Sequence, residues 1–301
     1  MEELIRANRR RSALVVLGFI VGVIGLGSLV GRLVGGGWLP TIVSAIVAGT
    51  SATIAWWTSD RIALAVSRAR PAAEDEFRRL HNLVEGLCIA AGLPKPRVYV
   101  IDDPAPNAFA TGRNPRHAAI AVTTGLLESL DRVELEGVIA HELSHIRHHD
   151  ITVSTIVVTL VGMVALLSDL AIRTMWWNGG RIRREGDRAD RSNPLALIGI
   201  ILILLSPLIA RLLQASVSRR RETLADEGAC HLTRYPPGLI SALEKLRDDT
   251  TVTHSASTAT AHLWIEQPMS GVGDRGRLGA VHRLFDTHPP LDERIAHLRD
   301  L

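Results

Sequence analysis

The chain has 301 residues, of which 47% are hydrophobic and only 4% aromatic, and its formal net charge is +3. Arginines are in excess around the apolar regions 1–71 and 151–217, whereas acidic residues are in excess elsewhere. This distribution argues against nucleic acid as a partner and fits a chain anchored at a cytoplasmic membrane surface. The two cysteines, Cys88 and Cys230, have no CxxC spacing, which excludes a cysteine-ligated zinc site and argues against a disulfide framework.

Four long and nearly uncharged runs predict an α-helical membrane anchor with four spans: 13–31, 38–57, 151–172 and 195–213. Each run is close to the ~20 residues that a helix needs to cross the hydrocarbon core. Five of the six tryptophans lie at the edges of these runs, where indole rings prefer the membrane interface. The first run is long for the core of a cleaved signal peptide, and the second follows closely. We therefore expect both to be anchors of a multi-pass protein.

The remainder predicts one α+β domain in two parts, 72–150 and 218–301, which follow membrane hairpins at 1–71 and 151–217. Apolar spacings of three and four predict a helix over 73–91, and alternation predicts a strand at 97–101.

Strands at 107–111 and 118–123 flank the sequence GRNPRH, which is typical of a hairpin loop. The strand at 118–123 is either an edge strand that pairs with an extended substrate or, equally, an ordinary strand. A further helix begins at Asp131, because Asp131 and Glu134 form a capping-box pattern. The second part predicts helices within 218–232, 236–248 and 289–301, and a mobile Ser/Thr-rich loop over 248–261.

The motif HELSH, residues 141–145, places two histidines one helical turn apart on one face. His141 and His145 can therefore offer their imidazoles to a single metal ion, while Glu142 reaches a water on that metal without ligating it. This is the HExxH arrangement of zinc hydrolases. Zinc lowers the pKa of its water toward ~7, and a carboxylate beside that water can take its proton and pass it to the leaving amine.

A catalytic zinc needs a third protein ligand, and no third histidine follows at the spacing of the HExxHxxGxxH class. The segment RRRETLAD offers Glu222 and, one turn later on the same face, Asp226, with Glu227 as its neighbour. Spacing alone ranks these three acids nearly equally. One of them would bind zinc, and another would accept a hydrogen bond from a ligand histidine.

The sequences NAFATG, AIAVTTGLL, VIAHELSHI, RRRETLADEGA and FDTHPPLDERIAHLR occur in this order, interleaved with the predicted spans. Over nearly its whole length the chain resembles the HtpX-type membrane zinc metalloproteases, relatives of the CAAX prenyl proteases. The resemblance implies a zincin-like (gluzincin) catalytic domain that binds one Zn²⁺ per chain. It assigns Glu222 as the third ligand and Asp226 as the acid behind the ligands.

The resemblance also implies a function in protein quality control and the stress response. The enzyme would be an endopeptidase that cleaves misfolded or damaged membrane proteins, with Glu142 as general base. It would act in the bacterial inner membrane, with its catalytic domain on the cytoplasmic side.

The remaining polar residues near the motifs have less specific interpretations. We interpret His148 and His149 as polar residues at the end of a helix rather than as ligands, and Arg294 as a structural ion-pair partner. His288, in the sequence THPP, either assists the oxyanion or forms a structural turn before the last helix.

The third run starts at residue 151 and Glu222 follows the fourth run closely, so the metal is expected near the membrane surface.

Arginines at 6–11 and 61–70 predict that both ends of the first hairpin are cytoplasmic. Two full crossings by the third and fourth runs then place the loop 173–193 outside, despite its arginines. A shallow re-entrant hairpin is the alternative, because it would keep these arginines on the cytoplasmic side. An intramembrane protease is disfavoured by the charges around HELSH. A non-catalytic membrane scaffold with a structural metal site is the alternative, and Glu142 argues against it because such a site needs no base.

Overall fold

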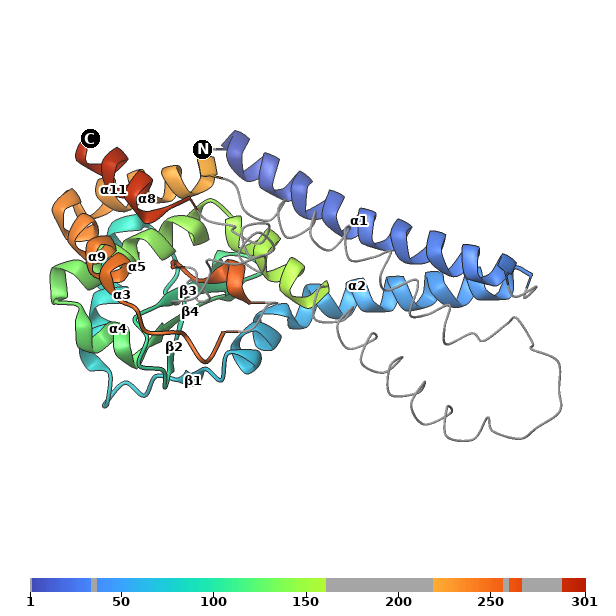
Figure 1. Ribbon diagram of the computed structural model, residues 1–301, viewed down its shortest axis with the longest axis horizontal. Coiled ribbons are helices and arrows are strands. Elements are labelled where there is room, and N and C mark those ends of the chain that lie inside the picture. The colour runs from blue at the N-terminus through green and yellow to red at the C-terminus, as the bar shows by residue number, and fades with distance from the viewer. Residues whose placement is uncertain (1, 34–36, 161–218, 257–259, 267–288) are drawn as a thin grey trace.

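A computed structural model describes residues 2–33, 37–160, 219–256, 260–266 and 289–301. It consists of a long helical hairpin and a body of helices around a small sheet (Figure 1). Residues 161–172 of the third predicted span, the whole fourth span, the loop 173–193 and His288 lie outside the described residues.

The hairpin consists of α1 (Glu2–Leu33) and α2 (Leu39–Val66), which lie side by side and project from the body (Figure 1). Within the described residues, one helical stretch, Thr41–Val66, is long and apolar enough to cross a membrane. It contains most of the second predicted span. The third predicted span begins as a shorter apolar helix, Asp150–Leu160. The remaining predicted spans stay predictions.

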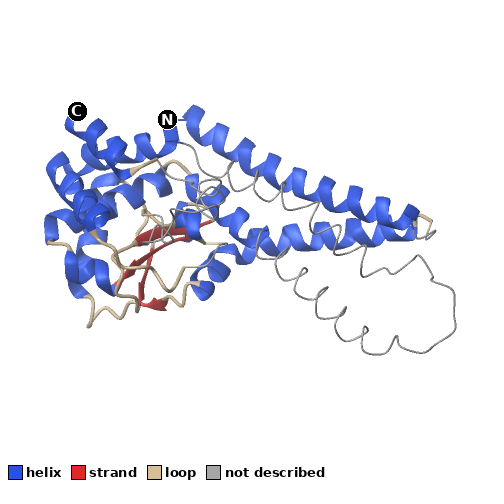
Figure 2. Cartoon of the chain, viewed as in Figure 1, coloured by secondary structure: helices blue, strands red, loops and turns tan. Residues whose placement is uncertain are grey.

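The sheet has four strands in the order β1 (Arg70–Pro71), β2 (Arg97–Ile101), β4 (Ala118–Thr123) and β3 (Ala108–Gly112). The predicted hairpin is confirmed: β3 and β4 are antiparallel, and a 3-10 turn at Pro115–His117 lies between them. Strand β2 pairs in parallel with β4, so the two inner strands run in the same direction. Figure 2 shows the strands at the centre of the body, with helices around them.

The predicted helices are present, with one shifted boundary. Helix α3 (Arg78–Ala91) begins five residues later than expected, because the Ala72 N–H pairs with the Val98 carbonyl at 3.0 Å and keeps this segment at the sheet. Gly92 ends α3 with a φ of 66°, a left-handed conformation that glycine adopts without steric cost. The other helices are α4 (Thr124–Ser129), α5 (Arg132–Arg147), α8 (Arg219–Thr233), α9 (Pro236–Asp248) and α11 (Leu291–Arg299).

The predicted Ser/Thr-rich loop follows α9 and is partly packed into the body. Thr253 is buried, and the Ser255 N–H donates to Asp103 Oδ2 at 2.7 Å. These contacts hold this part of the segment against the body, and the expected mobility of the loop stays a prediction. Residues 257–259 lie outside the described residues.

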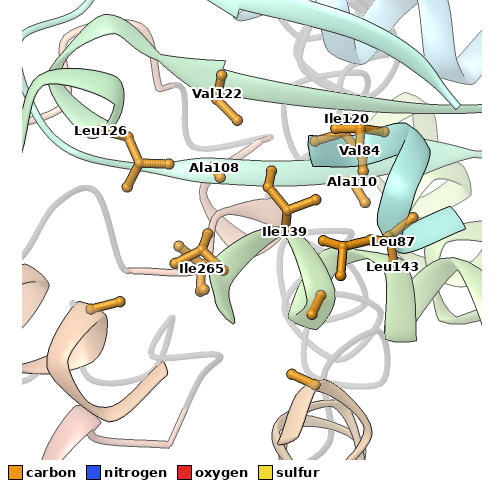
Figure 3. Packing of buried hydrophobic residues seen from close by; sticks show 14 of the residues in the cluster. Val84, Leu87, Ala108, Ala110, Ile120, Val122, Leu126, Ile139, Leu143 and Ile265 are labelled. Carbon is orange, nitrogen blue, oxygen red and sulfur yellow. The ribbon is translucent and has the colours of Figure 1, made fainter. Parts of the chain in front are cut away.

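Each face of the sheet has its own hydrophobic cluster. Ala108 and Ala110 face a cluster that includes Val84 and Leu87 of α3 and Ile139 and Leu143 of α5 (Figure 3). This cluster also contains side chains from α8, α9 and α11, so both parts of the predicted catalytic domain share one core.

The opposite face of the sheet packs against the end of the membrane hairpin. Phe109 points to this side, and its ring meets Trp264 edge-on at 4.8 Å. Ala63 and Leu64 of α2 belong to the same cluster. The sheet is therefore held between the helical body and the base of the hairpin.

Candidate metal centre

Helix α5 carries the HELSH motif, and its start is fixed by the predicted capping box. The Asp131 carboxylate accepts from the backbone N–H groups of Val133 and Glu134, and Glu134 accepts from the Asp131 N–H at 2.7 Å. Glu134 also accepts from Ser241 and Lys245 of α9. These contacts lock α5 against α9 and leave His141 and His145 one turn apart on one face.

Helix α8 brings Glu222 to the same place. The ligand atoms of His141, His145 and Glu222 all lie within 4.8 Å of one another, the one such group that could hold a metal among the described residues. The two histidine Nε2 atoms are 3.2 Å apart. The Glu222 oxygens lie 3.7 Å from His141 Nε2 and 3.6 Å from His145 Nε2.

Both histidines are held from behind by a carboxylate. His141 Nδ1 lies 2.9 Å from Asp226 Oδ1, and His145 Nδ1 lies 3.2 Å from Asp150 Oδ2. A hydrogen bond at Nδ1 fixes the tautomer and orientation of the ring and leaves Nε2 as the donor atom for a metal. Both Nε2 atoms therefore point to one spot beside Glu222.

Arg294 of α11 completes the support of Asp226. Its Nε and Nη2 donate to the two Asp226 oxygens at 2.9 Å and 2.7 Å, a bidentate pair, and Nη1 donates to the Ile265 carbonyl at 3.2 Å. Its Nη1 also lies 4.0 Å from Glu222 Oε2. The predicted ion-pair role of Arg294 is confirmed, and the pair lies directly behind the candidate metal centre.

Sequence reasoning missed Asp150. On a continuous helix, residue 150 would be rotated about 140° from residue 145, at about 100° per residue, and would face elsewhere. Instead α5 ends at Arg147, and His149 adopts a left-handed φ of 60°. The chain bends there and returns the Asp150 carboxylate to His145. The available signal was an acidic residue five positions after His145, but this spacing predicts a contact only if the chain bends between the two residues.

The donor set fits a zinc ion. Two nitrogens that each bind tetrahedral zinc at 2.0–2.1 Å lie about 3.3 Å apart, close to the separation of the two Nε2 atoms. Two histidines and one carboxylate, with the histidines oriented by further carboxylates, form the usual ligand set of a catalytic zinc with one open position.

Glu142 lies beside this centre rather than in it. It is buried and lines a cavity of about 30 Å³ together with His145, Asp150 and Glu222. That volume has room for one or two water molecules. Glu142 therefore adjoins the same small cavity as two of the three candidate ligands, His145 and Glu222.

The charges around the two histidines separate their pKa values. Burial lowers the pKa of His141 to about 4, and the positive charge of Arg294 adds to this effect. Burial also opposes the charged form of His145, but the carboxylates of Glu222 and Asp150 outweigh it and raise the pKa to about 9. Burial would raise the pKa of Asp226, yet Arg294 and His141 lower it to about 2.

Other predicted residues lie apart from the cluster. Glu227, which spacing could not separate from Glu222, points to His297 of α11 at 3.2 Å. His148 caps the end of α5, and neither it nor His149 belongs to the metal-binding group. The structure thus separates acids that spacing alone ranked nearly equally.

Of the two interpretations of the strand at 118–123, the structure supports an ordinary inner strand rather than a sheet edge. This segment is β4, which lies between β2 and β3, and β3 is the outer strand. Ala110 of β3 lines the cavity next to Glu142. Farther along the same strand, the Ala108 carbonyl accepts from the Ile265 N–H at 2.9 Å. Strand order depends on long-range pairing, which alternation along one strand does not encode.

Comparison with known proteins assigns the chain to a family. Residues 74–301 match the model of peptidase family M48, and the chain belongs to this family. Among its relatives is the protease HtpX homolog of Caldanaerobacter subterraneus subsp. tengcongensis, 47% identical over 82% of this chain and 80% of that protein. The protease HtpX homolog of Tropheryma whipplei (strain Twist) is 44% identical over 100% of this chain and 98% of that protein.

The solved structure of S. mikatae Ste24p overlaps 99% of this chain and 67% of that chain, with a TM-score of 0.49 and 19% identity. That similarity is too low for a structural argument. The sequence relatives make the protein a membrane-bound metalloprotease, as the resemblance implied. The alternative of a non-catalytic membrane scaffold is thereby set aside.

Proposed function

We propose that the protein is a zinc-dependent endopeptidase in which His141, His145 and Glu222 hold one zinc ion. The observation that carries this proposal is the convergence of both Nε2 atoms and the Glu222 carboxylate, with Glu142 buried in the adjoining cavity. A zinc ion in such a site acts as a Lewis acid and makes its bound water acidic near neutral pH.

The chain's own groups then carry the proton. The Glu142 carboxylate accepts a proton from the water that attacks the peptide carbonyl and delivers it to the leaving amine. Asp226 and Asp150 hold the histidine rings in place, and Arg294 holds Asp226. The resemblance to the HtpX-type enzymes supports misfolded or damaged membrane proteins as substrates.

We also propose that the catalytic domain lies at the cytoplasmic surface of a bacterial inner membrane, in a multi-pass protein. Both ends of the α1–α2 hairpin adjoin the body, because Asn8 contacts Asp150 and Asp60 pairs with Arg97 at 2.6 Å. Arginines precede α1's apolar part and follow that of α2, which favours the cytoplasm for both ends. A substrate would then reach the cavity where it leaves the bilayer.

The Glu142→Gln variant tests the mechanism. It keeps the three ligands, so zinc content should equal that of the wild type, while casein cleavage should fall by about 10²–10⁴, the usual contribution of a general base. Zinc content is measured by mass spectrometry on the purified protein, and a chelator-treated wild type is the inactive control. Activity within tenfold of the wild type would contradict the assignment of Glu142 as base.

A further inference from the structure

The first helix of the protein reaches the metal centre through Asn8. This side chain is buried at the start of α1, and its Nδ2 donates to Asp150 Oδ1 at 2.6 Å and to the His148 carbonyl at 2.9 Å. Both partners are acceptors, so only the NH2 edge of the amide fits here. One amide therefore binds both the end of α5 and the carboxylate that follows it.

Asp150 in turn connects Asn8 with His145. Its Oδ2 lies 3.2 Å from His145 Nδ1, and its Oδ1 accepts from Asn8, so the two oxygens have different partners. A carboxylate held at one oxygen can still rotate, whereas one held at both has a fixed plane. Because Asp150 begins the helix Asp150–Leu160, just past the bend at His149, its position relative to His145 depends on contacts from outside α5.

We infer that Asn8 is a positioning residue of the metal centre: by fixing Asp150 against His145, helix α1 completes the site that α5 and α8 begin. This inference rests on the proposed function, since it assumes that His145 binds the zinc ion. The Asn8 amide donates to Asp150 and to the His148 carbonyl, and neither partner is one of the three candidate ligands. Its effect on zinc binding passes through Asp150, so a test has to separate this route from a general effect on folding.

The effect of losing Asn8 follows from its two hydrogen bonds. Without the amide, Asp150 Oδ1 and the His148 carbonyl lose a buried donor. The Arg221 guanidinium, whose Nη1 lies 3.9 Å from Asp150 Oδ1, is then a longer and weaker restraint on the orientation of this carboxylate toward His145. Loss of an oriented partner behind a ligand typically costs 10–100-fold in metal affinity or activity. Because Asn8 acts on His145 only through Asp150, we expect its loss to weaken zinc affinity by the lower end of this range, about tenfold.

A double-mutant cycle on the full-length protein in detergent provides the test. Zinc affinity is measured by chelator competition for the wild type, Asn8→Leu, Asp150→Ala and the double variant. Asn8→Leu is close in volume but donates nothing, and Asn8→Ser is a smaller substitute if the leucine variant is poorly folded. Ser12→Ala is the matched control, because Ser12 is buried one turn further along α1.

We expect Asn8→Leu to bind zinc about tenfold more weakly and Ser12→Ala to bind like the wild type. In the Asp150→Ala background, Asn8→Leu should have no further effect, because its route to His145 is already gone. The visible spectrum of the Co²⁺-loaded protein should change in Asn8→Leu as it does in Asp150→Ala, which a loss of general stability would not produce.

Wild-type zinc affinity in Asn8→Leu would overturn the inference while leaving the proposed function intact. Additive losses in the cycle would also overturn it, since Asn8 would then act by another route. Zinc affinity that stayed at the wild-type level after substitution of His141 and His145 would instead contradict the proposed function itself.

Discussion

Each histidine of the candidate metal centre is held at Nδ1 by its own carboxylate, and the two carboxylates are supported from opposite ends of the chain. Asp226 is fixed by Arg294 of α11, and Asp150 is fixed by Asn8 of α1. A buried carboxylate needs such partners, because an unpaired charge in the interior is costly. The geometry of the site is therefore sensitive to residues that make no contact with the metal position.

At the residue scale, Glu222 and Asp226 should respond differently to substitution. Glu222→Ala removes a proposed ligand and should abolish both stoichiometric zinc and proteolysis. Asp226→Asn keeps the shape of an outer partner and should weaken zinc affinity or activity by about 10–100-fold. Metal analysis after dialysis against a weak chelator distinguishes them. An empty site in Asp226→Asn together with a full site in Glu222→Ala would reverse the two roles.

The separated histidine pKa values predict a proton-linked metal affinity. In the metal-free protein His145, with a pKa of about 9, carries a proton at pH 7, whereas His141, with a pKa of about 4, does not. Zinc must displace the His145 proton, so its affinity should increase about tenfold per pH unit up to about pH 9. Calorimetry at pH 7 in buffers of different ionisation enthalpy should show one proton released. Proton-free binding at this pH would contradict a charged His145.

At the element scale, α5 is placed by close contacts at two glycines. A Cβ on Gly137 would lie 2.8 Å from the Leu239 backbone of α9, and one on Gly228 of α8 would lie 2.6 Å from Ser144 Oγ. The missing side chains let α8 and α9 approach α5 directly. The position of Glu222 beside the HELSH histidines depends on this packing.

Two glycine substitutions should therefore have opposite effects on stability. Gly137→Ala forces α5 and α9 apart and should lower the free energy of unfolding by about 1–3 kcal/mol. Gly86→Ala lies in the exposed interior of α3, where nothing is within 4 Å, and should raise it by up to about 1 kcal/mol. Thermal unfolding of the two variants in the same detergent makes the comparison. A stabilised Gly137→Ala would show that the two helices can separate without cost.

At the scale of the whole molecule, the hairpin and the catalytic body are joined at the base of the hairpin. Besides Asn8 with Asp150, the Arg113 guanidinium lies 4.3 Å from the centre of the Trp57 ring. Large apolar side chains farther along α1 and α2, such as Leu17 and Ile46, are exposed. This pattern fits a hairpin whose outer part is covered by lipid and whose base belongs to the enzyme.

The orientation of that hairpin is testable with single cysteines in a Cys88→Ala, Cys230→Ala background. Trp38→Cys lies at the tip between α1 and α2 and should react with an impermeant thiol reagent in intact cells or spheroplasts. Glu74→Cys lies on the body and should react only after lysis. Labelling in the opposite order would place the catalytic domain outside the cell and contradict the proposed topology.

The sequence by itself determined the local features of this protein. The capping box, the β3–β4 hairpin and the helices that carry HELSH and RRRETLAD follow from residues only a few positions apart. Such patterns can be predicted from sequence because helix and hairpin geometry fix which residues near in sequence contact each other. The pair His141 and His145, with Glu142 beside it, is local in the same sense.

Only the tertiary structure decided which distant side chains support the ligands. It separated Glu222 from Glu227 in space, which spacing alone could not do, placed β3 rather than β4 at the sheet edge, and brought Asn8 to Asp150 across 142 positions of sequence. The bend at His149 turned a five-residue spacing into a contact with His145. Contacts of this kind arise when separate elements pack around a common core, and no periodicity along the chain records which of their faces will meet.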